Sequence, residues 1–87
     1  MSKKNEYDHT PREARQTVGY NIRRLRLSND FSQEQLAFRA GINRAYLSTV
    51  ENGKRNISIE NIFAVADALE TDPRELLRPM EETKEEG

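Results

Sequence analysis

The feature that most constrains this chain is the short connector Gly41-Ile42-Asn43, which joins two segments that each carry the pattern of a helix. Before it, Ser32-Gln33-Glu34-Gln35 has the capping-box pattern, a serine at the helix start followed by a glutamine one turn later. After it, Asn43 can cap a helix over residues 44–52. So short a connector prevents an antiparallel return and suits the steep crossing of a helix-turn-helix, with Gly41 able to take the left-handed turn conformation.

The rest of the chain carries three more helical patterns and no strand-like alternation of polar and apolar residues. Thr10-Pro11-Arg12-Glu13 has the pattern of a helix start and predicts a helix over residues 11–28. Gly19 weakens the middle of this segment, which leaves a later start open. Ser58 caps a fourth helix, and Asp72-Pro73 caps a short fifth. We therefore expect an all-α fold, a compact bundle of five short helices.

The chain has 87 residues, which is the size of one small domain. We expect residues 1–15 to form a flexible amino-terminal arm and the start of the first helix, because the first nine positions show no apolar periodicity. Residues 16–80 then form a helix-turn-helix domain, with the motif itself at 33–52. Residues 81–87 form an acidic tail.

Charge is divided unevenly along the chain, although the net charge is only -1. Residues 12–56 contain nine Lys or Arg and four Asp or Glu, whereas residues 57–87 contain three bases and nine acids. A basic half joined to an acidic half indicates one surface that faces a polyanion and another that faces away from it.

Composition excludes several classes of function. The chain has no cysteine, so it has neither disulfides nor thiolate metal ligands, which fits a reducing, cytoplasmic location. Its one histidine, His9, lies in a polar stretch, and there is no glycine-rich phosphate loop, so we expect no enzyme, metal or cofactor. No apolar segment suggests a secretory signal or a membrane partner.

The third helical segment carries an outward face of small polar groups with one long base. Leu47 and Val50 are spaced to point inward, which leaves outward a short set of residues. This set is Arg44, Ala45, Ser48 and Thr49. Such a face fits the major groove of DNA, because bulky or acidic side chains there would clash with base edges or repel phosphates.

Several stretches of the sequence between residues 22 and 77 strongly resemble the Cro/CI-type (XRE-like) helix-turn-helix family of transcription regulators. The resemblance covers residues 22–77 without a gap and rests on many separate positions. They are Ile22-Arg23-Arg24-Leu25-Arg26, Ser32-Gln33-Glu34-Gln35-Leu36-Ala37, Ala40-Gly41-Ile42, Tyr46-Leu47-Ser48, Glu51-Asn52-Gly53-Lys54-Arg55 and Ile62-Phe63-Ala64-Val65-Ala66-Asp67-Ala68-Leu69. The stretch Arg55-Asn56-Ile57-Ser58-Ile59 is most similar to the controller proteins of restriction-modification systems. The implied fold is that of the lambda repressor.

The resemblance implies a role for individual residues. The implied base-reading residues are Arg44, Ala45, Tyr46, Ser48 and Thr49. The implied phosphate-binding residues are Gln33, Asn43, Asn52, Lys54 and Arg55. Arg26 and Glu51 match a structural ion pair of the family rather than readout positions.

We also expect a homodimer. The carboxy-terminal region carries more apolar residues than so short a segment needs for its own core, and the resemblance implies a symmetric dimer there. The candidate interface residues are Ile59, Phe63, Leu76, Leu77 and Met80. The expected ligand is double-stranded DNA with a palindromic operator, and RNA polymerase is a candidate partner.

A second class of function stays open at this point. The acidic carboxy-terminal half would also suit an antitoxin or other protein-interaction module in which DNA binding is secondary. A neighbouring toxin gene would favour that alternative, whereas a neighbouring methyltransferase and nuclease would favour a controller of a restriction-modification operon.

Overall fold

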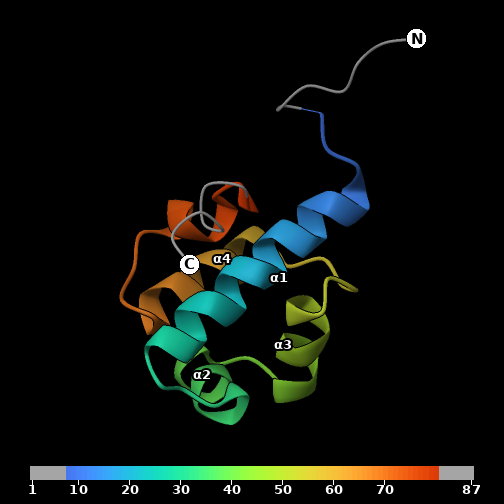
Figure 1. Ribbon diagram of the computed structural model, residues 1–87. Helices are drawn as coiled ribbons and strands as arrows, with labels where there is room; N and C mark the ends of the chain where they lie inside the picture. Colours follow the sequence, from blue (N-terminus) through green and yellow to red (C-terminus); the bar gives the residue numbers. More distant parts are fainter. Residues whose placement is uncertain (1–7, 81–87) are drawn as a thin grey trace, which may run out of the picture.

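The computed structural model describes residues 8–80, which fold into four α-helices and one short 3-10 helix (Figure 1). The elements are α1 (Pro11–Ser28), α2 (Gln33–Ala40), α3 (Arg44–Glu51), α4 (Ile59–Ala68) and the 3-10 helix η1 (Pro73–Leu77). In Figure 1, α1 crosses diagonally in front of α4, while α2 and α3 lie below it. Residues 1–7 of the predicted arm and the predicted tail at 81–87 lie outside the described residues.

The predicted α-helices are confirmed, and each begins at a predicted cap. The hydroxyl oxygens of Thr10 and Ser32 accept hydrogen bonds from the backbone N–H groups of the third helical residues, and both capping boxes are complete. The side-chain oxygen of Asn43 caps α3 by accepting from the N–H groups of Ala45 and Tyr46, and the hydroxyl of Ser58 caps α4 by accepting from the N–H of Asn61. The helix boundaries therefore follow from hydrogen bonds within one turn of the chain.

The prediction of five helices of one kind is wrong in its last element, because η1 is a 3-10 helix. Asp72 caps η1 by accepting the backbone N–H of Arg74 at 2.8 Å. A side-chain hydrogen bond from Arg74 lowers the pKa of Asp72 to about 2, so this cap stays ionised in neutral and mildly acidic solution. Pro79 then disfavours α conformation in the residue before it, and Arg78 is accordingly extended.

At Gly19, the backbone of α1 lies in close contact with the end of α3. The later helix start that this glycine left open is not observed, because α1 begins at Pro11 and continues through Gly19. A Cβ atom at position 19 would lie 2.5 Å from the carbonyl oxygen of Val50 and 2.7 Å from that of Glu51. Gly19 therefore lowers the helix propensity of α1 but lets the end of α3 pack directly on its backbone.

The core is a single cluster of small and medium aliphatic side chains, with contributions from every helix. Its buried members are Ile22, Leu36, Ala37, Leu47, Val50, Val65, Ala66, Leu69 and Leu76. One buried polar side chain joins η1 to α1, since the Nδ2 atom of Asn21 donates to the carbonyl oxygens of Leu76 and Arg78 at 3.1 and 2.8 Å. The last element of the fold is thereby held on the first.

We predict that Gly19→Ala lowers the free energy of unfolding by about 1–3 kcal/mol, as overpacking of a tight contact does. The expected loss outweighs the gain of about 1 kcal/mol that alanine brings to an open helix position. Urea denaturation followed by circular dichroism measures the difference. Arg23→Ala, at an exposed position of the same helix, is the control. A stabilised Gly19→Ala variant would show that α1 and α3 are farther apart than described.

Candidate nucleic-acid interface

Helix α3 is fixed from one side only. Its buried residues Leu47 and Val50 face the core, and it packs against α1 and α2. Arg44 and Ala45, at its first turn, are exposed. Arg44 makes no hydrogen bond or ion pair with any residue in the range 8–80. The exposed first turn of α3 is therefore free to meet a ligand.

The turn before α3 sets its direction. Gly41 has a left-handed backbone with φ of 72°, and no atom would lie within 4 Å of a Cβ there, so its role is conformational. The N–H of Ile42 donates to the carbonyl of Ala37 at 3.0 Å, which closes α2. Asn43 then accepts from the N–H groups of Ala45 and Tyr46 through its Oδ1 atom. Its Nδ2 group stays available as a donor at the amino end of α3.

Ser48 and Thr49 are half-buried on the second turn of α3. The hydroxyl of Thr49 donates to the carbonyl oxygen of Tyr46 at 2.8 Å. This bond uses the only hydroxyl proton of Thr49, so the side chain can offer a partner only its methyl group and the lone pairs of its oxygen.

Tyr46 is held more tightly than the other predicted base-reading residues. Its hydroxyl donates to the carbonyl oxygen of Asn56 and accepts from the Nδ2 group of Asn61, both at 3.3 Å. The guanidinium of Arg55 lies over its ring, 5.3 Å from the centroid. Tyr46 thus ties α3 to the following loop and to α4, a link that the sequence pattern did not reveal.

The predicted phosphate-binding residues lie at both ends of the α3 face. Gln33 is the first residue of α2, and Asn43 is the cap of α3. Beyond the other end of α3, Asn52, Lys54 and Arg55 are all exposed in the loop that leads to α4. The structure therefore places these residues on either side of the predicted base-reading face.

A buried ion pair connects the three helices around this face. The Nε and Nη2 atoms of Arg26 donate to the two carboxylate oxygens of Glu51 at 2.7 and 3.0 Å. The Nη1 atom of Arg26 donates to the carbonyl of Phe31 at 2.9 Å, and the Nε2 atom of Gln33 donates to Glu51 at 3.1 Å. The link to Gln33 was not predicted, and it joins the predicted ion pair to a predicted phosphate ligand.

The predicted dimer residues divide between core and surface. Ile59, Phe63 and Leu77 are 68%, 53% and 54% exposed, which is unusual for side chains of this size. Leu76 differs, because it is fully buried in the core of its own protomer and has no side-chain surface for a second copy. Met80 is half-buried. The adjacent residues Leu76 and Leu77 of η1 thus point in opposite directions, one into the core and one to solvent. The sequence pattern did not distinguish them.

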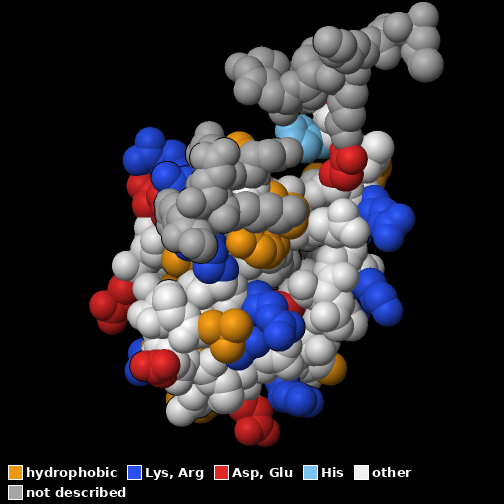
Figure 2. All heavy atoms as spheres, viewed as in Figure 1, with side chains coloured by type: hydrophobic (Ala, Val, Ile, Leu, Met, Phe, Trp, Pro, Cys, Tyr) orange, Lys and Arg blue, Asp and Glu red, His pale blue; other side chains and the backbone are white. Residues whose placement is uncertain are grey.

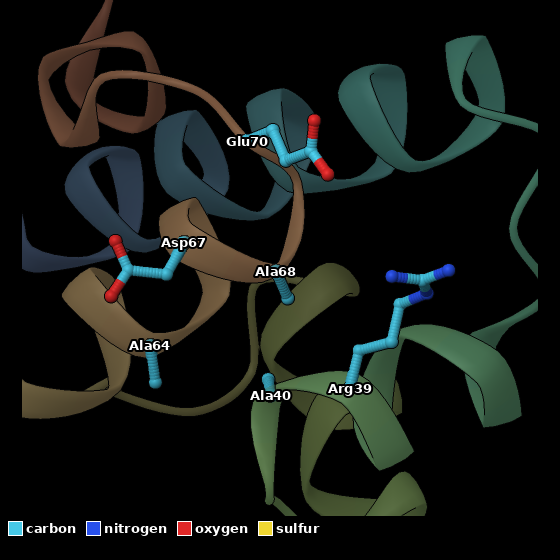
Figure 3. A pocket seen from close by; sticks show the side chains of 6 residues that line it. All are labelled: Arg39, Ala40, Ala64, Asp67, Ala68 and Glu70. Carbon is cyan, nitrogen blue, oxygen red and sulfur yellow. The ribbon is translucent and has the colours of Figure 1, made fainter.

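A separate shallow hollow lies between α2 and α4. Arg39 and Ala40 of α2 and Ala64, Asp67 and Ala68 of α4 line this hollow together with Glu70 (Figure 3). Small alanines let the two helices approach, and charges of both signs stand around the rim. None of the predicted DNA-contacting residues lines this hollow. Within residues 8–80, no three acidic or histidine side chains are grouped as a metal site would require, and no helix could span a membrane.

An exposed second helix of a tight helix-turn-helix, flanked by cations and amides, is the arrangement found in DNA-binding regulators. The family model described as helix-turn-helix matches residues 22–76. The chain belongs to this helix-turn-helix family.

Known proteins similar to this chain include restriction-modification regulators. Control protein C.BamHI from Bacillus amyloliquefaciens is 43% identical over 60 residues, which cover 68% of this chain and 74% of that protein. The crystal structure of the restriction-modification controller protein C.AhdI from Aeromonas hydrophila is 45% identical, with a TM-score of 0.70 over 71% of this chain and 94% of that one.

The hypothetical transcription factor NHTF from Neisseria is 32% identical, with a TM-score of 0.78 over 98% of both chains. The chain is thus a helix-turn-helix transcription regulator homologous to restriction-modification controller proteins, as the sequence resemblance implied.

We predict that Glu51→Ala lowers the free energy of unfolding by about 3–5 kcal/mol, because Arg26 then stays buried without its charge partner. Chemical denaturation measures this loss. Arg74→Ala removes the exposed ion pair with Asp72 and should leave stability nearly unchanged. Equal, small effects of both substitutions would contradict a structural role for the buried pair.

Proposed function

We propose that this protein reads a palindromic DNA operator as a symmetric homodimer and regulates a restriction-modification operon. The observation that carries the proposal is the exposed Arg44, which has no partner within residues 8–80 and lies beside small side chains on a helix whose other face is buried. The homology with controller proteins supports the class of operon. We place the protein in the cytoplasm, where its operator and RNA polymerase, the candidate partner, would be found.

In this proposal, Arg44 donates two parallel hydrogen bonds to O6 and N7 of a guanine, the contact for which the guanidinium fork is best suited. Ala45 and the methyl group of Thr49 contact thymine methyl groups, while the Thr49 oxygen accepts from a base amino group. Ser48 donates or accepts at the next base edge. Tyr46, whose hydroxyl is already bound within the protein, contributes the edge of its ring rather than a hydrogen bond.

Contacts to the DNA backbone would fix the register of α3 in the groove. The first N–H groups of α2, at Gln33, point along the helix axis and suit a phosphate oxygen. The amide groups of Asn43 and Asn52 donate to neighbouring phosphates, and Lys54 and Arg55 add charge at the far end of α3. These contacts supply affinity for any sequence, whereas Arg44 supplies the choice of sequence.

Dimerisation would use the exposed apolar residues of α4 and η1. Ile59, Phe63 and Leu77 are the members of the predicted set with surface to bury, with Met80 beside them, and Leu76 is left out because it is already in the core. A two-fold axis through this surface would present two α3 helices about 34 Å apart, to successive major grooves of one duplex.

We predict that Arg44→Ala costs about 1–3 kcal/mol of binding free energy on the operator and little on random DNA. The operator is first obtained by selection from a random duplex pool, where a palindrome with a guanine in each half is expected. Fluorescence anisotropy then compares both duplexes. Lys54→Ala is the matched control, since loss of a phosphate contact weakens both duplexes alike. An equal loss on both duplexes for Arg44→Ala would remove it from base reading.

We predict that Phe63→Asp converts the dimer to a monomer, because it places a charge in the proposed apolar interface. Analytical ultracentrifugation measures the mass in solution, and circular dichroism checks the fold. Phe38→Asp is the control, because Phe38 of α2 is even more exposed, at 88%, but lies outside the predicted set. The proposal fails if the Phe63 variant stays dimeric or if only the Phe38 variant dissociates.

A further inference from the structure

We infer that a further phosphate-binding site lies between the first turns of α1 and the loop after α3, where Arg15 and Arg55 hold a phosphodiester of the DNA backbone. Arg15 lies before residue 22, where the segment matched by the family model begins. The inference deepens the proposed function and rests on it, because the ligand is the duplex that α3 reads.

The loop after α3 is seated on α1 at this place. The Nε atom of Arg15 donates to the carbonyl oxygen of Gly53 at 3.1 Å. Gly53 is buried with φ of 74°, and a Cβ atom there would lie 3.0 Å from the Cγ atom of Gln16. Arg15 and Gly53 are 38 residues apart in the chain. The bond therefore fixes the guanidinium of Arg15 beside the loop that carries Lys54 and Arg55.

Arg15 and Arg55 line one open hollow of about 110 Å³. The other residues that line it are Ala14, Val18, Val50, Asn56 and Ile57. This lining has two cations, one amide and no carboxylate, and its remaining surface is aliphatic. Charges beside an aliphatic surface are less screened than charges surrounded by water, so the hollow favours an anion.

Both guanidinium groups are positioned before any ligand arrives. Arg15 uses only its Nε atom within residues 8–80, so its two terminal NH2 groups can still donate to phosphate oxygens. Arg55 is held by the ring of Tyr46, which is itself fixed by Asn56 and Asn61. Two arginines held in place lose little side-chain entropy on binding and present forked donors to a tetrahedral anion.

The position of the hollow points to DNA as the source of that anion. In Figure 2, basic side chains stand along the right-hand edge of the molecule, where α1 begins and the loop after α3 turns. The exposed Arg12 and Lys54 belong to the same two segments as Arg15 and Arg55. Arg55 lines the hollow and also lies over the ring of Tyr46 of α3, so a DNA backbone that passes the end of α3 would come close to the hollow.

The test compares the salt dependence of DNA binding for the wild-type protein, Arg15→Gln and Arg39→Gln. Loss of one phosphate contact should reduce the slope of log K against log salt concentration by about 0.9 and weaken operator and random duplexes equally. Arg39 lines the separate hollow between α2 and α4, so its variant should keep the wild-type slope. Thermal unfolding checks that Arg15→Gln is folded, and Arg15→Lys, which keeps the charge, should recover most of the slope.

A second measurement locates the phosphate. Single backbone phosphates of the operator are replaced, one at a time, by neutral methylphosphonates. One position should weaken binding of the wild-type protein and have a clearly smaller effect on Arg15→Gln, in which only Arg55 still reaches that phosphate. An unchanged slope for Arg15→Gln, or no position that couples to Arg15, overturns the inference.

The experiments distinguish a failure of the proposed function from a failure of the further phosphate site. If the wild-type protein prefers its operator over random DNA but Arg15→Gln is unchanged, only the further site is wrong. If the wild-type protein shows no such preference, the proposed function is wrong, and the slope on random DNA still decides the role of Arg15.

Discussion

The buried pair of Arg26 and Glu51 is the interaction on which the rest of the structure depends. It connects the end of α1 to the end of α3, and its remaining donors and acceptors reach the loop before α2 and the first residue of α2. Burial removes two charges from water, which costs free energy. Hydrogen bonds to nearly every polar atom of the two side chains offset this cost. The resulting network links the first residue of α2 to the last residue of α3, and so supports the arrangement of the two helices that the turn at Gly41 begins.

Close backbone contact between α1 and α3 complements this network. Gly19 allows the carbonyl groups at the end of α3 to rest on α1, and Arg15 binds the carbonyl of Gly53 one turn earlier along the same face of α1. Residues 15, 19, 22 and 26 recur every three or four positions, so one face of α1 supports the whole of α3 and the loop beyond it. Helix α3 is only eight residues long, so its stability depends on this packing rather than on its own length.

The division of charge along the sequence becomes a division of surface in the fold. The basic half supplies α3, its flanking loop and the start of α1, while the acidic half begins with the loop that leads into α4. Acidic residues around α4 and η1 are thus kept from the surface proposed to face DNA, where they would repel phosphates. Within residues 8–80, the exposed apolar residues Ile59, Phe63 and Leu77 lie in the acidic half, whereas Leu27 and Phe38 lie in the basic half. The acidic half therefore carries the surface proposed to meet a second copy.

The sequence alone determined the helices, their caps and the family, because capping bonds and apolar periodicity act within one or two turns of the chain. It also indicated that Arg44 and Ala45 of α3 would be exposed, whereas Ser48 and Thr49, expected on the same outward face, are half-buried. The tertiary structure decided the 3-10 form of η1, the burial of Leu76 next to an exposed Leu77, and the contacts of Gln33, Tyr46 and Arg15. These contacts join residues 10 to 38 positions apart, and they depend on helix crossing angles that no local pattern specifies.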